Sequence, residues 1–233
     1  MEIQEPSPRL LISALRFQTV SPLLLDKRGE LVARFAQDYQ LPEWNASQDT
    51  VQLVTRDGRR LFQLSVRDMF VSIENFEDLG EATDWAHGLM SDTIEALAVD
   101  RITWTGVRMH WLSAVDSFNE LRRWFMDRFG NTPIAAAKAL GRESSDLGIV
   151  REFKDEKPLY SMRFGPMRAE QAMAQLFRDK DATHYPDEFL LLDIDSVYPD
   201  DALNAAEALG KWHERVDNLS SLGDRVARAI AES

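Results

Sequence analysis

The chain has 233 residues and no cysteine, and its 39 Asp and Glu against 27 Lys and Arg give a formal net charge of −12. A hydrophobic fraction of 44% and a charged fraction of 28% are ordinary for a soluble globular protein. The acidic balance disfavours a nucleic-acid partner, because phosphate backbones are bound chiefly through clustered Lys and Arg. The lack of cysteine excludes disulfides and thiolate metal sites.

Neither a membrane span nor a secretory signal is indicated by the sequence. No apolar stretch approaches the roughly 18 residues typical of a spanning helix. Residues 1–8 lack the basic start and the apolar centre of a secretory signal. We therefore expect a cytoplasmic protein without a membrane partner.

Hydrophobic periodicity predicts two successive series of elements. Residues 1–99 are predicted to contain a strand at 10–17, a helix at 26–39, a hairpin at 51–66, a strand at 69–74 and a helix at 76–97. Residues 100–233 are predicted to contain a strand at 102–112, a helix at 117–129, a hairpin at 147–164, a strand at 189–195 and a helix at 200–230. A further helix at about 167–178 is an insertion in the second series.

This recurrence predicts an α+β fold of two similar β-α-β-β-β-α halves, 1–99 and 100–233, within one compact unit. Hairpin connections imply antiparallel pairing, so the halves are expected to share one antiparallel sheet with helices on one face. The order of elements resembles the repeated unit of the TATA-binding-protein-like fold. That resemblance lies in element order alone, and no DNA-binding role is inferred from it.

A second resemblance concerns residues. The opening segment 8–17 reads PRLLISALRF, the late segment 191–195 reads LLDID, and the last helix carries Trp212, His213 and Leu219. These features are similar to landmarks of a sporadically distributed, uncharacterised bacterial protein family of about this length. The resemblance implies a bacterial cytosolic protein, and it brings no activity, cofactor or catalytic residue.

Alternation along the predicted strands places aromatic and charged side chains together on the sheet face opposite the helices. Trp104, Arg108 and His110 share this face on one strand, and Asp193 and Asp195 share it on another. The complete set predicted to form an interaction or ligand face is Phe70, Trp104, Arg108, His110, Arg163, Asp193 and Asp195.

The two aspartates admit two interpretations. Carboxylates at positions i and i+2 of a strand could bind Mg²⁺ or divide acid and base roles. Alternatively they pair with arginines of neighbouring strands, for which Arg16, Arg108 and Arg163 are candidates. The ion-pair interpretation is favoured, because a buried charge needs a partner and Asp-x-Asp without a third ligand is a common pattern.

No catalytic residue, metal site or cofactor is predicted. The four histidines form no HExxH pair, and neither GxSxG nor a glycine-rich phosphate loop occurs. His184, in a polar loop before Tyr185 and Pro186, is expected to have a polar surface role.

The favoured function is therefore a non-catalytic module that binds a protein partner or a second copy of itself, for example as a homodimer. The first alternative is a small-molecule or metal-dependent enzyme with its site on the same sheet face. The second is an acidic inhibitor or immunity-type partner of a basic protein, suggested by the net charge. The acidic residues Glu74, Glu77, Asp78, Glu81 and Asp84 fit that role, but they also fit the start of a helix.

Overall fold

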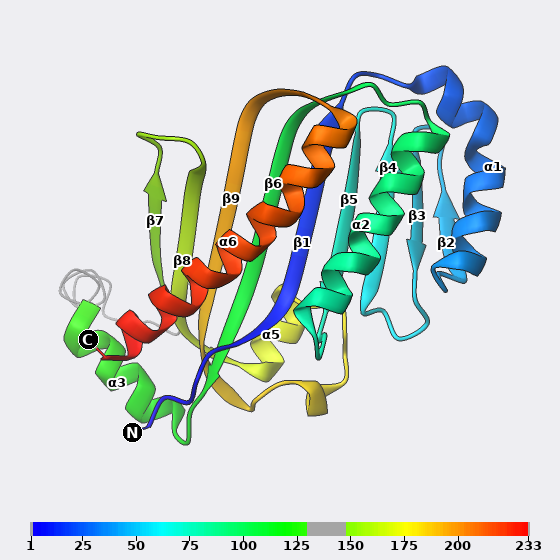
Figure 1. Ribbon diagram of the computed structural model, residues 1–233. Helices are drawn as coiled ribbons and strands as arrows, with labels where there is room; N and C mark the ends of the chain where they lie inside the picture. Colours follow the sequence, from blue (N-terminus) through cyan, green and yellow to red (C-terminus); the bar gives the residue numbers. More distant parts are fainter. Residues whose placement is uncertain (1, 130–147, 233) are drawn as a thin grey trace, which may run out of the picture.

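The computed structural model describes residues 2–129 and 148–232. Leu147, where the second hairpin is predicted to begin, lies outside the described residues. Within these ranges the chain combines antiparallel strands with packed helices, so the predicted α+β class and antiparallel sheet are confirmed (Figure 1).

The first half contains β1 (Ser7–Phe17), α1 (Ser21–Asp38), β2 (Glu43–Ala46), β3 (Thr50–Val54), β4 (Arg60–Ser65), β5 (Asp68–Glu74) and α2 (Leu79–Ala96). The second half contains β6 (Arg101–Ala114), α3 (Phe118–Phe129), β7 (Ile149–Phe153), β8 (Leu159–Arg168), α5 (Ala169–Gln175), the short 3₁₀ helix η1 (Ala182–His184), β9 (Glu188–Asn204) and α6 (Ala205–Glu232).

The described strands form a nine-stranded sheet in the order β2-β3-β4-β5-β1-β6-β9-β8-β7. The two halves meet where β1 pairs with β6. Outward from this pair, each half runs from its first strand to its last strand and then to the strands before it, with β2 additional in the first half. This order agrees with the predicted arrangement, whereas a structural repeat of the two halves and the division at residue 99 stay predictions.

The boundary between β9 and α6 differs from the prediction. Residues 200–204, predicted as the start of the last helix, continue β9, because the ladder with β6 extends to the pair of Arg101 and Asn204. The helix begins after Asn204, whose Oδ1 accepts a hydrogen bond from the backbone N–H of Glu207 at 2.9 Å. A side-chain oxygen at this position satisfies an N–H that the helix leaves unpaired, which fixes where the helix starts.

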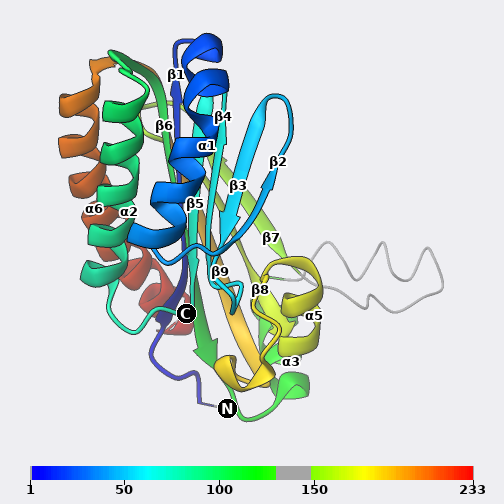
Figure 2. The ribbon, with the colours of Figure 1, turned by 90° about the vertical axis from the view of Figure 1, so that its right-hand side faces the viewer.

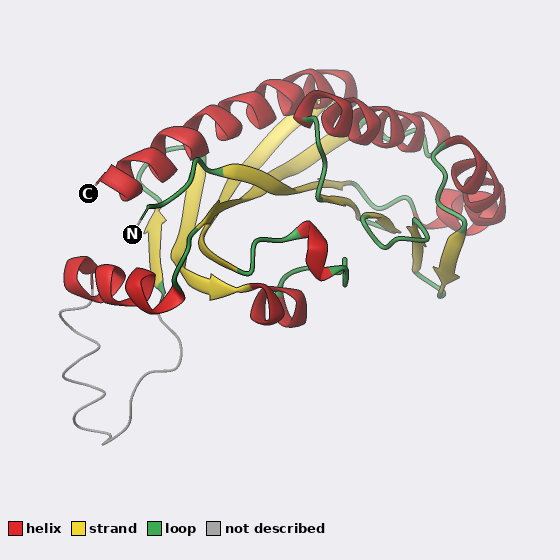
Figure 3. Cartoon of the chain, turned by 90° about the horizontal axis from the view of Figure 1, so that it is seen from below, coloured by secondary structure: helices red, strands yellow, loops and turns green. Residues whose placement is uncertain are grey.

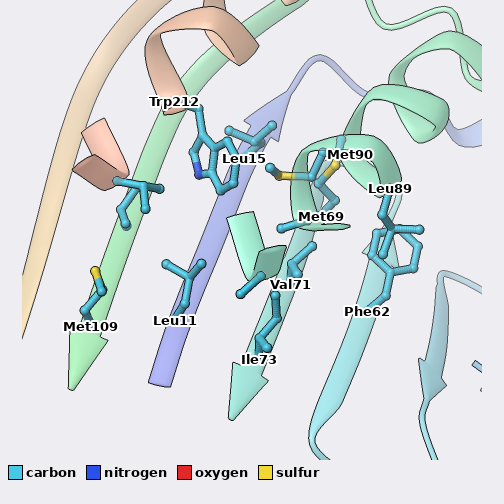
Figure 4. Packing of buried hydrophobic residues seen from close by; sticks show 14 of the residues in the cluster. Leu11, Leu15, Phe62, Met69, Val71, Ile73, Leu89, Met90, Met109 and Trp212 are labelled. Carbon is cyan, nitrogen blue, oxygen red and sulfur yellow. The ribbon is translucent and has the colours of Figure 1, made fainter. Parts of the chain in front are cut away.

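The main core lies between the sheet and its long helices. α6 packs over β6 and β9, α2 over β1 and β5, α1 over β3, and α3 beside β8. The strands contribute alternate residues such as Leu11, Leu15, Val71 and Met109 to this layer (Figure 4). We call this side of the sheet the outer face. Within the described ranges, no helix is both long enough and apolar enough to span a membrane.

Gly223 on α6 permits the closest contact of this core. A Cβ at Gly223 would lie 2.0 Å from Cζ2 of Trp111, a fully buried residue of β6. The indole Nε1 of Trp111 donates to Asp224 Oδ1 at 3.1 Å. Gly223 therefore allows α6 to pack directly on the indole ring.

The opposite side, which we call the inner face, is partly covered, contrary to the expectation that helices occupy one face only. Figures 2 and 3 show the segment 169–187, with α5 and η1, on the side of the sheet away from α1, α2 and α6. Its Ala172, Phe177 and Tyr185 form a second apolar cluster with sheet residues that include Leu10 and Leu191. We call segment 169–187 the cap.

Candidate functional site

All seven residues predicted to share a sheet face do so. Phe70 lies on β5, Arg163 on β8, and the remaining five lie on the central strands: Trp104, Arg108 and His110 on β6, and Asp193 and Asp195 on β9. In the register of these strands, His110 lies directly across from Asp193, and Arg108 directly across from Asp195. The structure thus gathers Arg108, His110 and Asp193 into one cluster, whereas Phe70 and Trp104 form a separate group.

Asp193 is the centre of that cluster. Arg108 donates two hydrogen bonds to it, from Nε to Oδ1 at 2.8 Å and from a terminal nitrogen to Oδ2 at 2.6 Å. His110 Nε2 lies 3.2 Å from Asp193 Oδ1. The predicted ion pair with a strand arginine is therefore confirmed for Arg108. For Arg16 and Arg163, no ion pair with Asp193 or Asp195 is found among the described residues.

The cluster separates the two aspartates electrostatically. Burial alone would raise the pKa of Asp193, but the contacts with His110 and Arg108 outweigh it and hold that pKa well below the usual range. Burial raises the pKa of Asp195, and the neighbouring charge of Asp193 adds to this effect while Arg108 opposes it. Asp193 is thus a firmly ionised partner of Arg108, and the charge of Asp195 is compensated less well.

The cap completes the burial of this cluster. The ring of Phe177 meets the imidazole of His110 edge to face, with ring centroids 5.9 Å apart. His110 and Asp193 are buried, while Arg108 keeps 36% of its side-chain surface exposed. The guanidinium is therefore the part of the cluster that a molecule at the surface can reach.

A hollow of about 300 Å³ lies on the part of the inner face that the cap leaves open. Its lining residues are Ala14, Arg16, Gln63, Asp68, Met69, Phe70 and Trp104. We call it the Phe70–Trp104 hollow. The indole of Trp104 lies over Gly106, where a Cβ would come within 2.5 Å of the ring, and Arg16 lies over the same indole at 5.4 Å. Ala14 and Gly106, opposite each other in the register, leave room for the hollow because their side chains are small or absent.

Arg163 lies apart from this hollow. It is exposed and borders a smaller hollow of about 200 Å³, together with Gly165, Met167 and Leu191. The register places Arg163 directly across from Asp193 on the side opposite His110. Arg163 is therefore a candidate surface contact on the same face.

A polar cluster that sequence reasoning missed fastens the cap to β5. The carboxylate of Glu74, which is buried, accepts hydrogen bonds from the backbone N–H groups of Arg178 and Asp179 at 2.8 and 2.9 Å. The guanidinium of Arg178 reaches Glu74 Oε1 at 3.0 Å. Burial raises the pKa of Glu74, and these contacts oppose that rise.

Asp179 extends the same cluster. It accepts a hydrogen bond from Asn75 Nδ2 at 2.9 Å and lies 2.7 Å from His184 Nδ1 and 3.3 Å from Arg59 Nε. His184 therefore has a structural contact, which corrects its predicted surface role. We call Glu74, Asn75, Arg178, Asp179 and His184 the clasp. No local motif marks it, because its two parts lie more than 100 residues apart in the sequence.

The acidic stretch at the start of α2 has structural tasks. Asp78 caps the helix by accepting a hydrogen bond from the backbone N–H of Glu81 at 2.8 Å. Glu81 lies 3.6 Å from Arg60, and Glu74 belongs to the clasp. These contacts support the helix-start interpretation of the acidic residues.

The donor chemistry of the inner face favours binding over metal chemistry. Within residues 2–129 and 148–232, no group of three or more His, Asp or Glu side chains is placed to hold a metal ion. Both oxygens of Asp193 are engaged by Arg108 and one also by His110. The arrangement stabilises the fold and orients Arg108 toward the surface.

Comparisons with known proteins identify no family. No family model matches the chain, and no curated protein matches it. The resemblances drawn from the sequence stay predictions.

Proposed function

We propose that this protein is a non-catalytic interaction module that binds a protein partner on the open part of its inner sheet face. The observation that carries the proposal is the Phe70–Trp104 hollow, in which two partly exposed aromatic rings flank a floor of small residues on a regular sheet. Aromatic and arginine side chains at a hollowed surface are typical anchors of protein interfaces.

The charges around the hollow suggest the chemistry of the partner. Arg16 and Arg108 present guanidinium groups on this face, although the chain as a whole carries a net charge of −12. Arg108 is held in place by Asp193, so its orientation costs little on binding. A partner segment with an apolar or aromatic side chain next to a carboxylate would fill the hollow and meet these arginines.

Affinity capture with variants tests this proposal. We expect the wild type to retain a partner from the cells that naturally produce the protein, and Trp104→Ala to lose it. Trp44→Gln, a change to an exposed tryptophan on β2, is the matched control. The partner is then purified and titrated against each variant, and we expect Trp104→Ala to weaken binding at least about tenfold, the effect of about 1.4 kcal/mol.

Two results of that titration would reject the proposal. One is unchanged affinity in the Trp104→Ala variant. The other is an equal loss in Trp44→Gln and Trp104→Ala, which would place the contact elsewhere. Circular dichroism spectra of both variants show whether each is folded.

The enzymatic alternative has less support from the geometry. Asp193 is engaged by Arg108 and His110, and its depressed pKa makes it a poor proton carrier near neutral pH. The acidic-inhibitor alternative has less support as well, because Glu74, Asp78 and Glu81 have partners within the fold. The inner-face module is therefore the function that we carry forward.

A further inference from the structure

The sheet ends on one side in an apolar surface formed by α1 and β2. β2 is the last strand in the sheet order, so the backbone groups on its outer side face away from β3. A groove of about 1050 Å³ lies between β2 and α1, and its lining includes Leu25, Val32, Ala36 and Trp44. Unpaired strand edges with adjacent apolar surface favour association with another chain.

The exposed apolar side chains of the described residues concentrate at this surface. Of the five large hydrophobic residues that are exposed, Leu23, Leu25 and Trp44 belong to α1 and β2, and Trp44 is 60% exposed. Trp44 lies across from the buried residue Leu53, so its ring is on the outer face, where α1 also packs. One partner placed here would cover the side chains of the strand and of the helix together.

Gly29 lies in the middle of α1, beside this groove. A Cβ at Gly29 would meet no atom within 4 Å, so the packing of the single chain does not require glycine at this position. Glycine within a helix costs about 1 kcal/mol relative to alanine. Close approach of a second helix, which a missing side chain permits, would account for this residue.

We propose that two copies of this chain associate through α1 and β2 around a two-fold axis. Each β2 would pair antiparallel with the other β2, and each α1 would pack on the other α1. A two-fold axis brings the same surface of both copies together, so one apolar groove meets its equal. It also makes two β2 strands antiparallel, as every strand pair of this sheet is.

Charge favours a second copy at this surface. Arg28 is the charged residue among those that line the groove, and it donates a hydrogen bond to the backbone oxygen of Ser47 at 2.5 Å. Two chains that each carry a net charge of −12 repel each other. The α1–β2 surface lets them meet without placing carboxylates of the groove lining against each other.

The size of the surface predicts a weak dimer. α1 has 18 residues and is therefore about 27 Å long, whereas β2 adds only four residues to the seam. Such a contact falls near the lower end of specific interfaces, below about 1,200 Å² of total buried area. We expect a dissociation constant on the order of micromolar.

Sedimentation velocity of the full chain between about 1 and 200 μM, a range chosen around that micromolar constant, tests the proposal. Trp44→Gln removes the exposed ring, and Gly29→Gln places a side chain where the second helix would approach. Phe153→Gln is the matched control, because Phe153 is an aromatic residue on β7, the opposite edge strand, and is 53% exposed. Thermal unfolding followed by circular dichroism shows that each variant is folded.

We expect the wild type and Phe153→Gln to convert from monomer to dimer across this range. Trp44→Gln and Gly29→Gln are expected to stay monomeric. A wild type that is monomeric throughout would overturn the proposal, as would a dimer that both α1–β2 variants leave intact. Trp104→Ala should not change the dimer, so this experiment and the partner titration fail independently.

Discussion

Arg108 forms its ion pair with Asp193, on the diagonal of the β6–β9 ladder, although Asp195 lies directly across from it. This choice gives two aspartates on one strand opposite electrostatic properties. The pKa of Asp193 is lowered and the pKa of Asp195 is raised, because only Asp193 is held by both Arg108 and His110 while Asp195 is buried with less compensation.

Asp193→Asn should destabilise the protein by about 2–4 kcal/mol. Removing one partner of a fully buried pair costs about 3–5 kcal/mol, and solvent around the part-exposed Arg108 reduces that figure. Urea denaturation at pH 7 measures the free energy of unfolding. A loss below about 1 kcal/mol, the size of an exposed ion pair, would contradict the central role of Asp193.

The same variant should change the response to acid. A carboxylate whose folded pKa is depressed contributes stability above its unfolded pKa of about 3.9, and loses it as pH falls through the folded pKa. The difference in stability between the wild type and Asp193→Asn is therefore expected to be constant above about pH 5, well above that unfolded value, and to shrink in stronger acid. Urea midpoints across this pH range measure it, and a difference that grows on acidification would refute the assignment.

Asp195→Asn should have the opposite sign. The raised pKa of Asp195 means that folding disfavours its charged form, so this cost is absent in acid and develops as pH rises from about 4 through the folded pKa. At neutral pH we expect the variant to match or exceed wild-type stability by up to about 1 kcal/mol. Because the substitution matches Asp193→Asn, a clear destabilisation at pH 7 would show that Asp195 has a partner of its own.

Gly223→Ala should destabilise the protein by about 1–3 kcal/mol, because the added methyl group overlaps the ring of Trp111 and forces the core to shift. Gly210→Ala is the control on the same helix, where a Cβ would meet no atom within 4 Å. Better helix propensity should leave Gly210→Ala unchanged or more stable by up to about 1 kcal/mol. Thermal unfolding of both variants decides the point, and equal effects would argue against the glycine–indole contact.

Asp179→Asn should loosen the cap while leaving the sheet intact. Asp179 joins Asn75, His184 and Arg59, and the substitution leaves buried groups without their charged acceptor at a cost of about 1–3 kcal/mol. Hydrogen exchange followed by mass spectrometry is expected to show faster exchange in residues 176–187. Asp187→Asn, an exposed carboxylate of the same segment, is the control and should exchange like the wild type. Faster exchange throughout the sheet would mean that the clasp supports the whole fold.

Local patterns predicted most of the sheet. The turn at Asp57 and Gly58 and the alternation in residues 69–74 lead directly to the observed β3, β4 and β5. Alternation also placed Arg108, His110 and Asp193 on one face before their register was known. Side-chain direction along a strand follows from a period of two, which a sequence displays openly.

What the sequence did not predict depends on tertiary contacts. β2 has only four residues and is fixed by its pairing with β3, and residues 200–204 are strand because β6 is long enough to pair with them. The covering of the inner face by the cap rests on contacts such as that of Glu74 with Asp179, across more than 100 residues. The choice of Asp193 over Asp195 required the geometry of the ladder and the cap.

Site-specific photo-crosslinking from the inner face tests the proposed binding surface most directly. A benzophenone amino acid replaces Phe70 in the full chain, and in a control it replaces Glu95, an exposed residue of α2. We predict a single adduct from position 70, lost when Trp104→Ala is added, and formed again when the identified partner is mixed with the purified protein. No adduct at position 70, or an adduct that Trp104→Ala leaves unchanged, would contradict binding at the Phe70–Trp104 hollow.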